Sequence, residues 1–240
     1  FDNEGSPEKC AEHFKTIANQ DFKIVFGPIF SQMADVTLSA IENKDIIVLS
    51  PTMSSDSLSD REDNFFRTVF PTSDQARVLA EYAIGRKLKN IAVIFDLSNA
   101  KYTQSIYETF RSICEKEQIS FPYVKGLKIE KSTRMLPIAM DIQKAEPDAV
   151  LTCMSAIDAA NLAQQLNKMG SLPQLIGISW TQTNDLLEHG GRSVEGMVLI
   201  AVYKRENKSQ HLIEFEEKYK NRYKRDPSFP ALLGYDAFSI

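Results

Sequence analysis

The stretch Phe22-Lys23-Ile24-Val25-Phe26-Gly27-Pro28-Ile29-Phe30-Ser31 decides the fold. Its first residues form a short apolar run, rich in β-branched and aromatic side chains, which predicts a buried strand that ends at Gly27-Pro28. Beyond Ser31, a helical period of apolar residues begins, at Val36, Ala40 and Ile41. A strand, a short turn and a helix in this order indicate an α/β protein with a parallel sheet.

The same unit recurs along the chain. Further strands are predicted at Ile46–Leu49, Ile91–Phe95, Ala149–Cys153, Leu175–Ile178 and Met197–Val202. Helical periodicity lies between them, for example at residues 8–19, 74–88 and 159–169. Continuous apolar strands are typical of parallel sheets that helices cover on both faces. The sequence therefore predicts parallel sheets flanked by helices, with right-handed crossovers.

The composition and motifs exclude several classes of function. The 240 residues carry a formal net charge of −4, whereas a nucleic-acid-binding protein usually has a basic face. No glycine-rich dinucleotide motif, phosphate-binding loop or nucleophile elbow is present. Cys10, Cys114 and Cys153 lack metal-ligand spacing and are predicted to be free, largely buried thiols. We therefore expect no catalytic residues, no metal and no cofactor.

Hydroxyl and aromatic side chains follow several of the predicted strands. Ser31 and Ser54 come after two successive strands, and each could either cap a helix or face an anion. Tyr102 and Trp180 follow two later strands, at Phe95 and Ile178. Ligands of open α/β sheets bind at the carboxyl ends of the strands. These four residues are therefore candidates for a cleft, with local packing as the alternative reading for each.

The ordered set of motifs resembles the branched-chain amino-acid-binding family of type I periplasmic binding proteins. The resemblance rests on Phe26–Ser31, Ile47–Ser54, Phe65–Thr68, Asp74–Ala76, Asp96–Tyr102, Glu146–Val150, Val194–Met197 and Tyr235–Ala237. Each motif is weak by itself, but together they run over essentially the whole chain in the right order.

The resemblance implies two α/β lobes that close on a ligand. Residues 1–71 and 203–240 would form part of the first lobe, and residues 72–202 the second. The chain would cross between them near Val69–Ser73 and again near Ala201–Arg205. The ligand contacts that it implies are Ser31, the backbone of Met53, the hydroxyl of Ser54, Tyr102, Ser155 and Ala156.

The sequence departs from the family at two points. In amino-acid-binding members an acidic residue holds the ligand's ammonium group, and here Ser179, followed by Trp180, takes that place, so both are expected ligand contacts. Asp158 is an alternative partner for the ammonium group. The chain also begins after the family's first strand, helix and second strand and stops before its last elements. The opening Phe1-Asp2-Asn3-Glu4-Gly5 does not have the pattern expected of a leader peptide, so secretion is an expectation from the resemblance alone.

The resemblance implies a periplasmic or extracellular protein that binds a small molecule, an amino acid or related organic acid, and delivers it to an ABC permease in the membrane. Neither nucleic acid nor a cofactor is implied. A ligand-sensing domain of a receptor or kinase is the first alternative. A doubly wound α/β enzyme is the second, although no catalytic constellation supports it.

Overall fold

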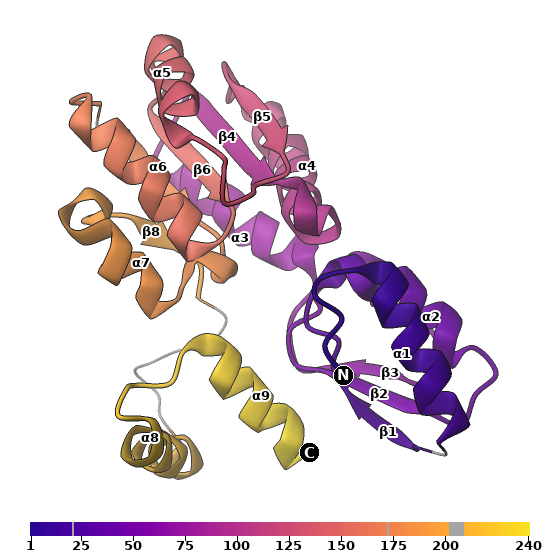
Figure 1. Cartoon of the computed structure of the whole chain (residues 1–240). Coiled ribbons are helices and arrows are strands. Elements are labelled where there is room, and N and C mark those ends of the chain that lie inside the picture. Colours follow the sequence, from indigo (N-terminus) through magenta and orange to yellow (C-terminus); the bar gives the residue numbers. More distant parts are fainter. Residues whose placement is uncertain (21, 172, 202–208) are drawn as a thin grey trace.

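The computed structural model describes residues 1–20, 22–171, 173–201 and 209–240. Within them the strands form two separate parallel sheets, one of order β1-β2-β3 and one of order β5-β4-β6-β7-β8 (Figure 1). The predicted α/β fold with parallel sheets flanked by helices is confirmed. Both sheets send the carboxyl ends of their strands into loops that meet between them.

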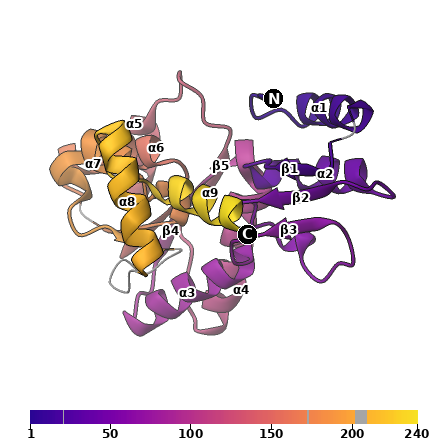
Figure 2. The same cartoon turned by 90° about the horizontal axis from the view of Figure 1, so that it is seen from below.

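The first sheet and its two helices come from the N-terminal part of the chain. The helices are α1 (Pro7–Asn19) and α2 (Ala34–Ile41), and the strands are β1 (Ile24–Phe26), β2 (Ile47–Ser50) and β3 (Phe65–Arg67). α1 and α2 lie on the same side of the sheet (Figure 2). Their apolar residues pack onto the strands around Phe14, Met33 and Val48.

The second sheet is a complete layered unit. Its strands are β4 (Ile91–Asp96), β5 (Val124–Leu127), β6 (Ala149–Cys153), β7 (Gln174–Gly177) and β8 (Val198–Leu199). Its helices are α3 (Thr72–Gly85), α4 (Ala100–Lys116), α5 (Met135–Ala145), α6 (Ala156–Lys168) and α7 (Asn184–Gly190). One apolar core lies between the sheet and α3 and α4, and another lies on the α5 and α6 face. This is the two-faced burial that the apolar strands predict.

The first sheet does not meet that expectation. Ile24 is 55% exposed and Phe26 is 43% exposed, because β1 is an edge strand and the described helices α1 and α2 cover only one face. The prediction of burial on both faces is therefore wrong for β1. The prediction of a strand over Met197–Val202 is also too long. β8 pairs only with the end of β7, through Val198 and Leu199, and Val202 lies outside the described residues.

The C-terminal helices are α8 (Gln210–Tyr223) and α9 (Phe229–Ser239). α9 returns to the first sheet, where the Phe238 ring stacks on Phe26 with a centroid distance of 3.8 Å (Figure 2). The chain leaves the first sheet after Arg67 and enters α3 at Thr72. We propose residues 1–71 with 203–240 as one lobe and 72–202 as the other. The second crossing, near Ala201–Arg205, falls almost entirely outside the described residues.

The three cysteines are free and buried, as expected. Burial raises the pKa of each thiol, and it raises that of Cys114 to about 12. Because the thiolate is the reactive form, we expect native protein at pH 8 to resist iodoacetamide, whereas protein unfolded in guanidinium should take up one adduct per cysteine. Mass spectrometry after both treatments measures this, and rapid labelling of the native protein would contradict the burial.

Over the described part of the chain, no helix has both the length and the apolar character of a membrane crossing. Within the same residues, no cluster of three or more histidine, cysteine or acidic side chains is arranged to hold a metal ion.

Candidate ligand-binding site

A half-open cavity of about 150 Å³ lies where the loops of the two sheets meet. The first sheet contributes the turn after β1 and the loop after β2, and the second contributes α3, α4 and the loops after β4 and β7. α9 closes the remaining side. The lining residues are Ile29, Phe30, Ser31, Thr52, Ser54, Val69, Gln75, Asn99, Tyr102, Ser179, Trp180, Phe229, Pro230 and Leu233.

Two serines of the first lobe meet at the cavity wall. The backbone N–H of Ser54 donates to Ser31 Oγ at 3.0 Å, so the loop after β2 is tied to the turn after β1. Thr72 Oγ1 donates its hydrogen to the Ser54 carbonyl oxygen. The hydrogen bond between the Ser54 and Thr72 hydroxyl groups therefore uses the hydrogen of the Ser54 hydroxyl. Ser31 begins a short 3₁₀ turn, Ser31–Met33, and caps neither that turn nor α2. The capping alternative for Ser31 is therefore wrong.

Three polar groups from distant parts of the chain form a cluster at the opposite wall. The Tyr102 hydroxyl lies 2.9 Å from Gln75 Oε1 and 2.7 Å from Ser179 Oγ, and Ser179 Oγ lies 3.0 Å from the same Gln75 oxygen. All three residues are buried. Burial also raises the pKa of the Tyr102 phenol far above its usual range, so the phenol stays protonated and remains a hydrogen-bond donor.

Aromatic rings from both lobes line the cavity. Phe30, in the turn after β1, meets Trp180, in the loop after β7, edge to face at a centroid distance of 5.9 Å. Phe229 at the start of α9 and the Tyr102 ring complete the aromatic lining. Edge-to-face packing is a favoured geometry of aromatic pairs, and it leaves ring faces free for a further ring.

Direct contacts across the cleft hold the two lobes together. The backbone N–H of Gln32 donates to Asn99 Oδ1 at 3.0 Å, and Lys101 Nζ lies 2.8 Å from the Asp35 carboxylate. The first pair joins the turn before α2 to the loop before α4, and the second joins α2 to α4. These contacts bring the hydroxyl groups of the first lobe opposite the polar cluster of the second.

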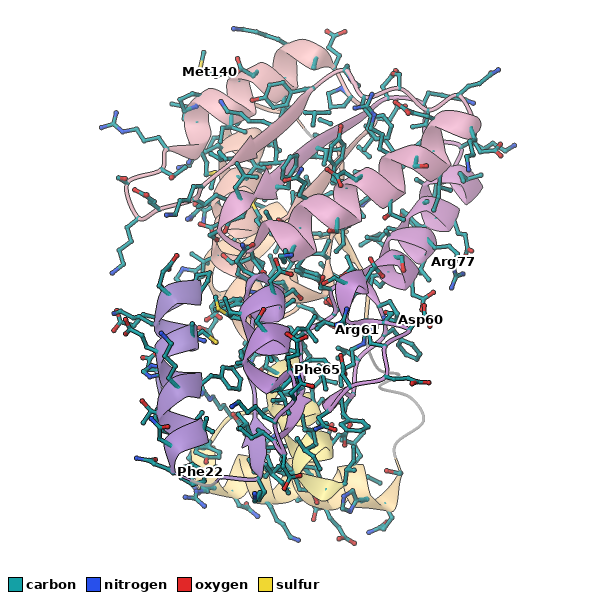
Figure 3. All side chains as sticks on the ribbon, turned by 90° about the vertical axis from the view of Figure 1, so that its right-hand side faces the viewer. Phe22, Asp60, Arg61, Phe65, Arg77 and Met140 are labelled. Atoms are coloured by element: carbon teal, nitrogen blue, oxygen red, sulfur yellow. The ribbon has the colours of Figure 1, made fainter. Side chains whose placement is uncertain are left out.

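The long loop between β2 and β3 is held by a half-buried arginine. The Arg67 guanidinium donates to the Ser55 carbonyl at 2.8 Å and also to the Ser59 hydroxyl. Asp56 accepts hydrogen bonds from the backbone N–H and the hydroxyl of Ser73, which ties the loop to α3. Figure 3 shows Asp60 and Arg61 on this loop, on the side of the molecule that also carries Arg77 of α3. The part of the loop that follows Ser54 is thereby held in place.

The structure brings together five of the eight residues expected from the sequence: Ser31, Ser54, Tyr102, Ser179 and Trp180. Met53 does not reach the cavity. Its side chain is fully buried in the core of the first lobe, and its N–H donates to Ser50 Oγ at 3.1 Å. Ala156 is 3% exposed and packs between α6 and the second sheet.

Ser155 lines a larger, open pocket of about 700 Å³ beside the cavity. Its hydroxyl caps α6, accepting from the N–H of Asp158 and donating to the Asp158 carboxylate. Asp158 lies in the first turn of α6 and faces this open pocket, together with Asp96 and Lys128. Burial, assisted by the Asp96 charge, raises the pKa of Asp158, while the Ser155 hydrogen bond lowers it.

Sequence reasoning missed most of the cavity wall, including Gln75, Asn99, Thr52 and Phe229. Gln75 lies in a segment with helical periodicity, where a glutamine looks like any other polar residue of the helix. Asn99 precedes α4 and reads as a loop residue. Phe229 is far along the chain and reaches the site only because α9 returns to the first lobe. None of these carries a local pattern that separates it from its neighbours in sequence.

The model of the family described as periplasmic binding protein matches residues 1–240. The chain belongs to the periplasmic binding protein family. A search of curated proteins finds no match to the sequence. The family assignment therefore rests on the match over the full chain.

Solved structures show that this periplasmic binding protein has the type I fold. The leucine-binding protein LivK of Thermotoga maritima superposes with a TM-score of 0.87 at 18% identity, over 99% of this chain and 68% of that one. LivJ of Streptococcus pneumoniae, in complex with isoleucine, superposes with a TM-score of 0.87 at 17% identity, over 99% of this chain and 68% of that one. An ABC-transporter solute-binding protein of R. palustris, in complex with benzoate, superposes with a TM-score of 0.86 at 20% identity, over 99% of this chain and 66% of that one. The chain thus spans about two thirds of their length.

The cavity of this periplasmic binding protein is walled by uncharged groups. Among the described residues, its lining contains no aspartate, glutamate, lysine, arginine or histidine. Acidic side chains gather instead in the open pocket next to it, which includes Glu4, Glu8, Asp96 and Asp158. The described lining of the cavity therefore offers a ligand hydrogen bonds and apolar contacts rather than ion pairs.

Proposed function

We propose that this chain is an extracytoplasmic solute-binding protein that captures a small, carboxylate-bearing ligand, an amino acid or related organic acid, for an ABC importer. The observation that carries the proposal is the cavity at the carboxyl ends of the strands of both sheets, with hydroxyl groups of Ser31, Tyr102 and Ser179 in its wall. Ligand cavities of open α/β folds form at this end of the sheets.

The similar structures support this ligand class. LivJ is in complex with isoleucine and the R. palustris protein with benzoate, and both ligands carry a carboxylate. Their proteins are binding proteins of transporters, which supports a membrane permease as the partner and a location outside the cytoplasm. The proposal includes no catalytic step, because the described lining of the cavity offers no nucleophile paired with a base.

Ser31 is the residue that we assign to the ligand carboxylate. Its Oγ accepts from Ser54, and no acceptor among the described residues takes its hydroxyl hydrogen, which therefore stays available to a ligand. The Ser54 hydroxyl, by contrast, is committed to Thr72. Ser54 thus positions Ser31 through its backbone, and Ser31 makes the contact.

The first experiment is a thermal-shift screen of the purified protein against amino acids, aromatic acids, amides and short aliphatic acids. A ligand at about 100 times its Kd stabilises the native state by about 2.7 kcal/mol, which raises Tm measurably. Stabilisation by at least one carboxylate, and by none of the matched amides, is the expected result. Stabilisation by amides alone would contradict a carboxylate site.

Ser31→Ala should weaken the binding of the best carboxylate from this screen about tenfold or more, because a hydrogen bond to a charged group contributes about 1.5–3 kcal/mol. Isothermal titration calorimetry measures the change in Kd. Ser39→Ala is the matched control, since Ser39 lies exposed on α2 away from the cavity. Equal affinities of the two variants would remove Ser31 from the site.

A further inference from the structure

Two buried amides in the cavity wall have donors without acceptors. Gln75 is 6% exposed and Asn99 is 5% exposed. Gln75 Oε1 accepts from the Tyr102 and Ser179 hydroxyls, and Asn99 Oδ1 accepts from the Gln32 N–H, which leaves both side-chain nitrogens without an acceptor among the described residues. Because Gln182 Oε1 is the one fully enclosed unpaired polar atom in those residues, both nitrogens face open space.

The cluster of Gln75, Tyr102 and Ser179 keeps a spare donor in either orientation of the amide. Three contacts join these groups, whereas the two hydroxyls supply only two hydrogens. With the amide oxygen toward the hydroxyls, its N–H₂ group is spare. With the amide turned over, its N–H₂ group donates one hydrogen to each of the two hydroxyl oxygens, and one hydroxyl donates to the other. All three contacts are then satisfied, and the hydrogen of the second hydroxyl is spare. An incoming acceptor therefore always finds a donor here.

The balance of groups favours an anion over a zwitterion. A carboxylate can accept from Ser31, Asn99 and the cluster, and hydrogen bonds to a charged acceptor are roughly twice as strong as neutral ones. An ammonium group would need an acidic partner, and the cavity lining has none in the described part of the chain. Burying an unpaired charge in such a site is strongly unfavourable.

The size and walls of the cavity favour a flat ligand. A volume of about 150 Å³ matches that of apolar protein cavities that hold a benzene ring. Phe30, Trp180, Tyr102 and Phe229 surround this volume, and aromatic side chains gain stability from stacked or edge-on contact with another ring.

We propose that the cavity selects a flat, single-ring monocarboxylate without an α-ammonium group, and that Gln75 is the residue that determines this preference. This inference rests on the proposed function, because it names the ligand class of the same site. Gln75 belongs to α3, next to the crossing between the lobes, and its amide leaves the cluster with a spare donor for the anion, either its own N–H₂ group or a hydroxyl.

The decisive test compares ligands that differ only in the ammonium group. Phenylacetate and L-phenylglycine form one pair, 4-methylpentanoate and L-leucine another, and benzoate is the smallest ring acid. Calorimetry should give benzoate or phenylacetate the lowest Kd, with the amino acid of each pair at least about tenfold weaker. If L-leucine or L-phenylglycine binds more tightly than its partner, this inference is overturned while the proposed function stands. Binding of no carboxylate would overturn both.

Gln75→Glu tests the assigned residue at nearly constant size. The new carboxylate repels an anion and offers a partner to an ammonium group, so the ratio of benzoate to phenylglycine affinity should fall at least about tenfold. Gln75→Met removes the donors without adding charge, and should weaken benzoate without improving phenylglycine. Gln20→Glu, exposed at the end of α1, is the charge control. Folding of each variant is checked by circular dichroism, and an unchanged ratio in folded Gln75→Glu would exclude Gln75 from the selection.

Discussion

Phe110→Ala is expected to lower the free energy of unfolding by about 3–5 kcal/mol, which is the usual cost of truncating a fully buried aromatic residue. Phe110 is 0% exposed on α4, and its ring meets Phe121 edge to face at 6.0 Å. Removing it opens a void between α4 and the second sheet that neighbouring side chains cannot fill without leaving their rotamers.

Urea unfolding followed by circular dichroism measures this loss as a lower midpoint. Leu187→Ala is the matched control, because Leu187 is 70% exposed on α7 of the same sheet unit and should change stability by less than about 0.5 kcal/mol. Similar midpoints for the two variants would mean that the packing around Phe110 is not the rigid core described here.

Trp180→Ala is expected to weaken the binding of benzoate about 30-fold or more, equivalent to about 2 kcal/mol, as is usual for a tryptophan at the centre of a binding site. Trp180 lines the cavity and packs edge to face against Phe30, so its loss both removes ring contacts with the ligand and lets water enter between the lobes. Trp180→Phe keeps a ring and should lose less.

Calorimetric titration of the three proteins gives the order of affinities. Phe66→Ala serves as the control for loss of an aromatic residue, since Phe66 is 54% exposed on β3 and does not line the cavity. An unchanged Kd in Trp180→Ala would show that the ligand does not contact Trp180.

The two lobes differ in how fully their sheets are covered, and the site lies between them. The second sheet has an apolar core on each face, whereas the described helices α1 and α2 pack on one face of the first, with α9 reaching it through Phe238 (Figures 1 and 2). The groups that line the cavity from the first lobe sit on turns after β1 and β2, which the Ser31–Ser54 bond and the Arg67 contacts hold in place.

The hydroxyl and aromatic site residues that follow strands could be predicted from the sequence. Ser31, Ser54, Tyr102, Ser179 and Trp180 each follow a strand whose apolar run marks its end, and the carboxyl ends of parallel strands lie at one edge of a sheet. Ser155 follows a strand in the same way, yet its hydroxyl caps α6 and lies in the open pocket. A serine after a strand therefore does not by itself distinguish a residue of the binding site from a helix cap.

The sequence by itself determined the strand–helix alternation and six of the eight described strands, because apolar periodicity is a local property that each segment carries alone. It did not predict the short strands β3 and β5. It also determined the family, through motifs spread along the whole chain. Only the tertiary structure decided that Gln75, Asn99 and Phe229 share a wall with Ser31, that Met53 stays in the core, and that Ile24 and Phe26 of β1 remain partly exposed. Those facts depend on crossovers that bring distant segments together, and on which hydrogen-bond donors remain unpaired once they meet.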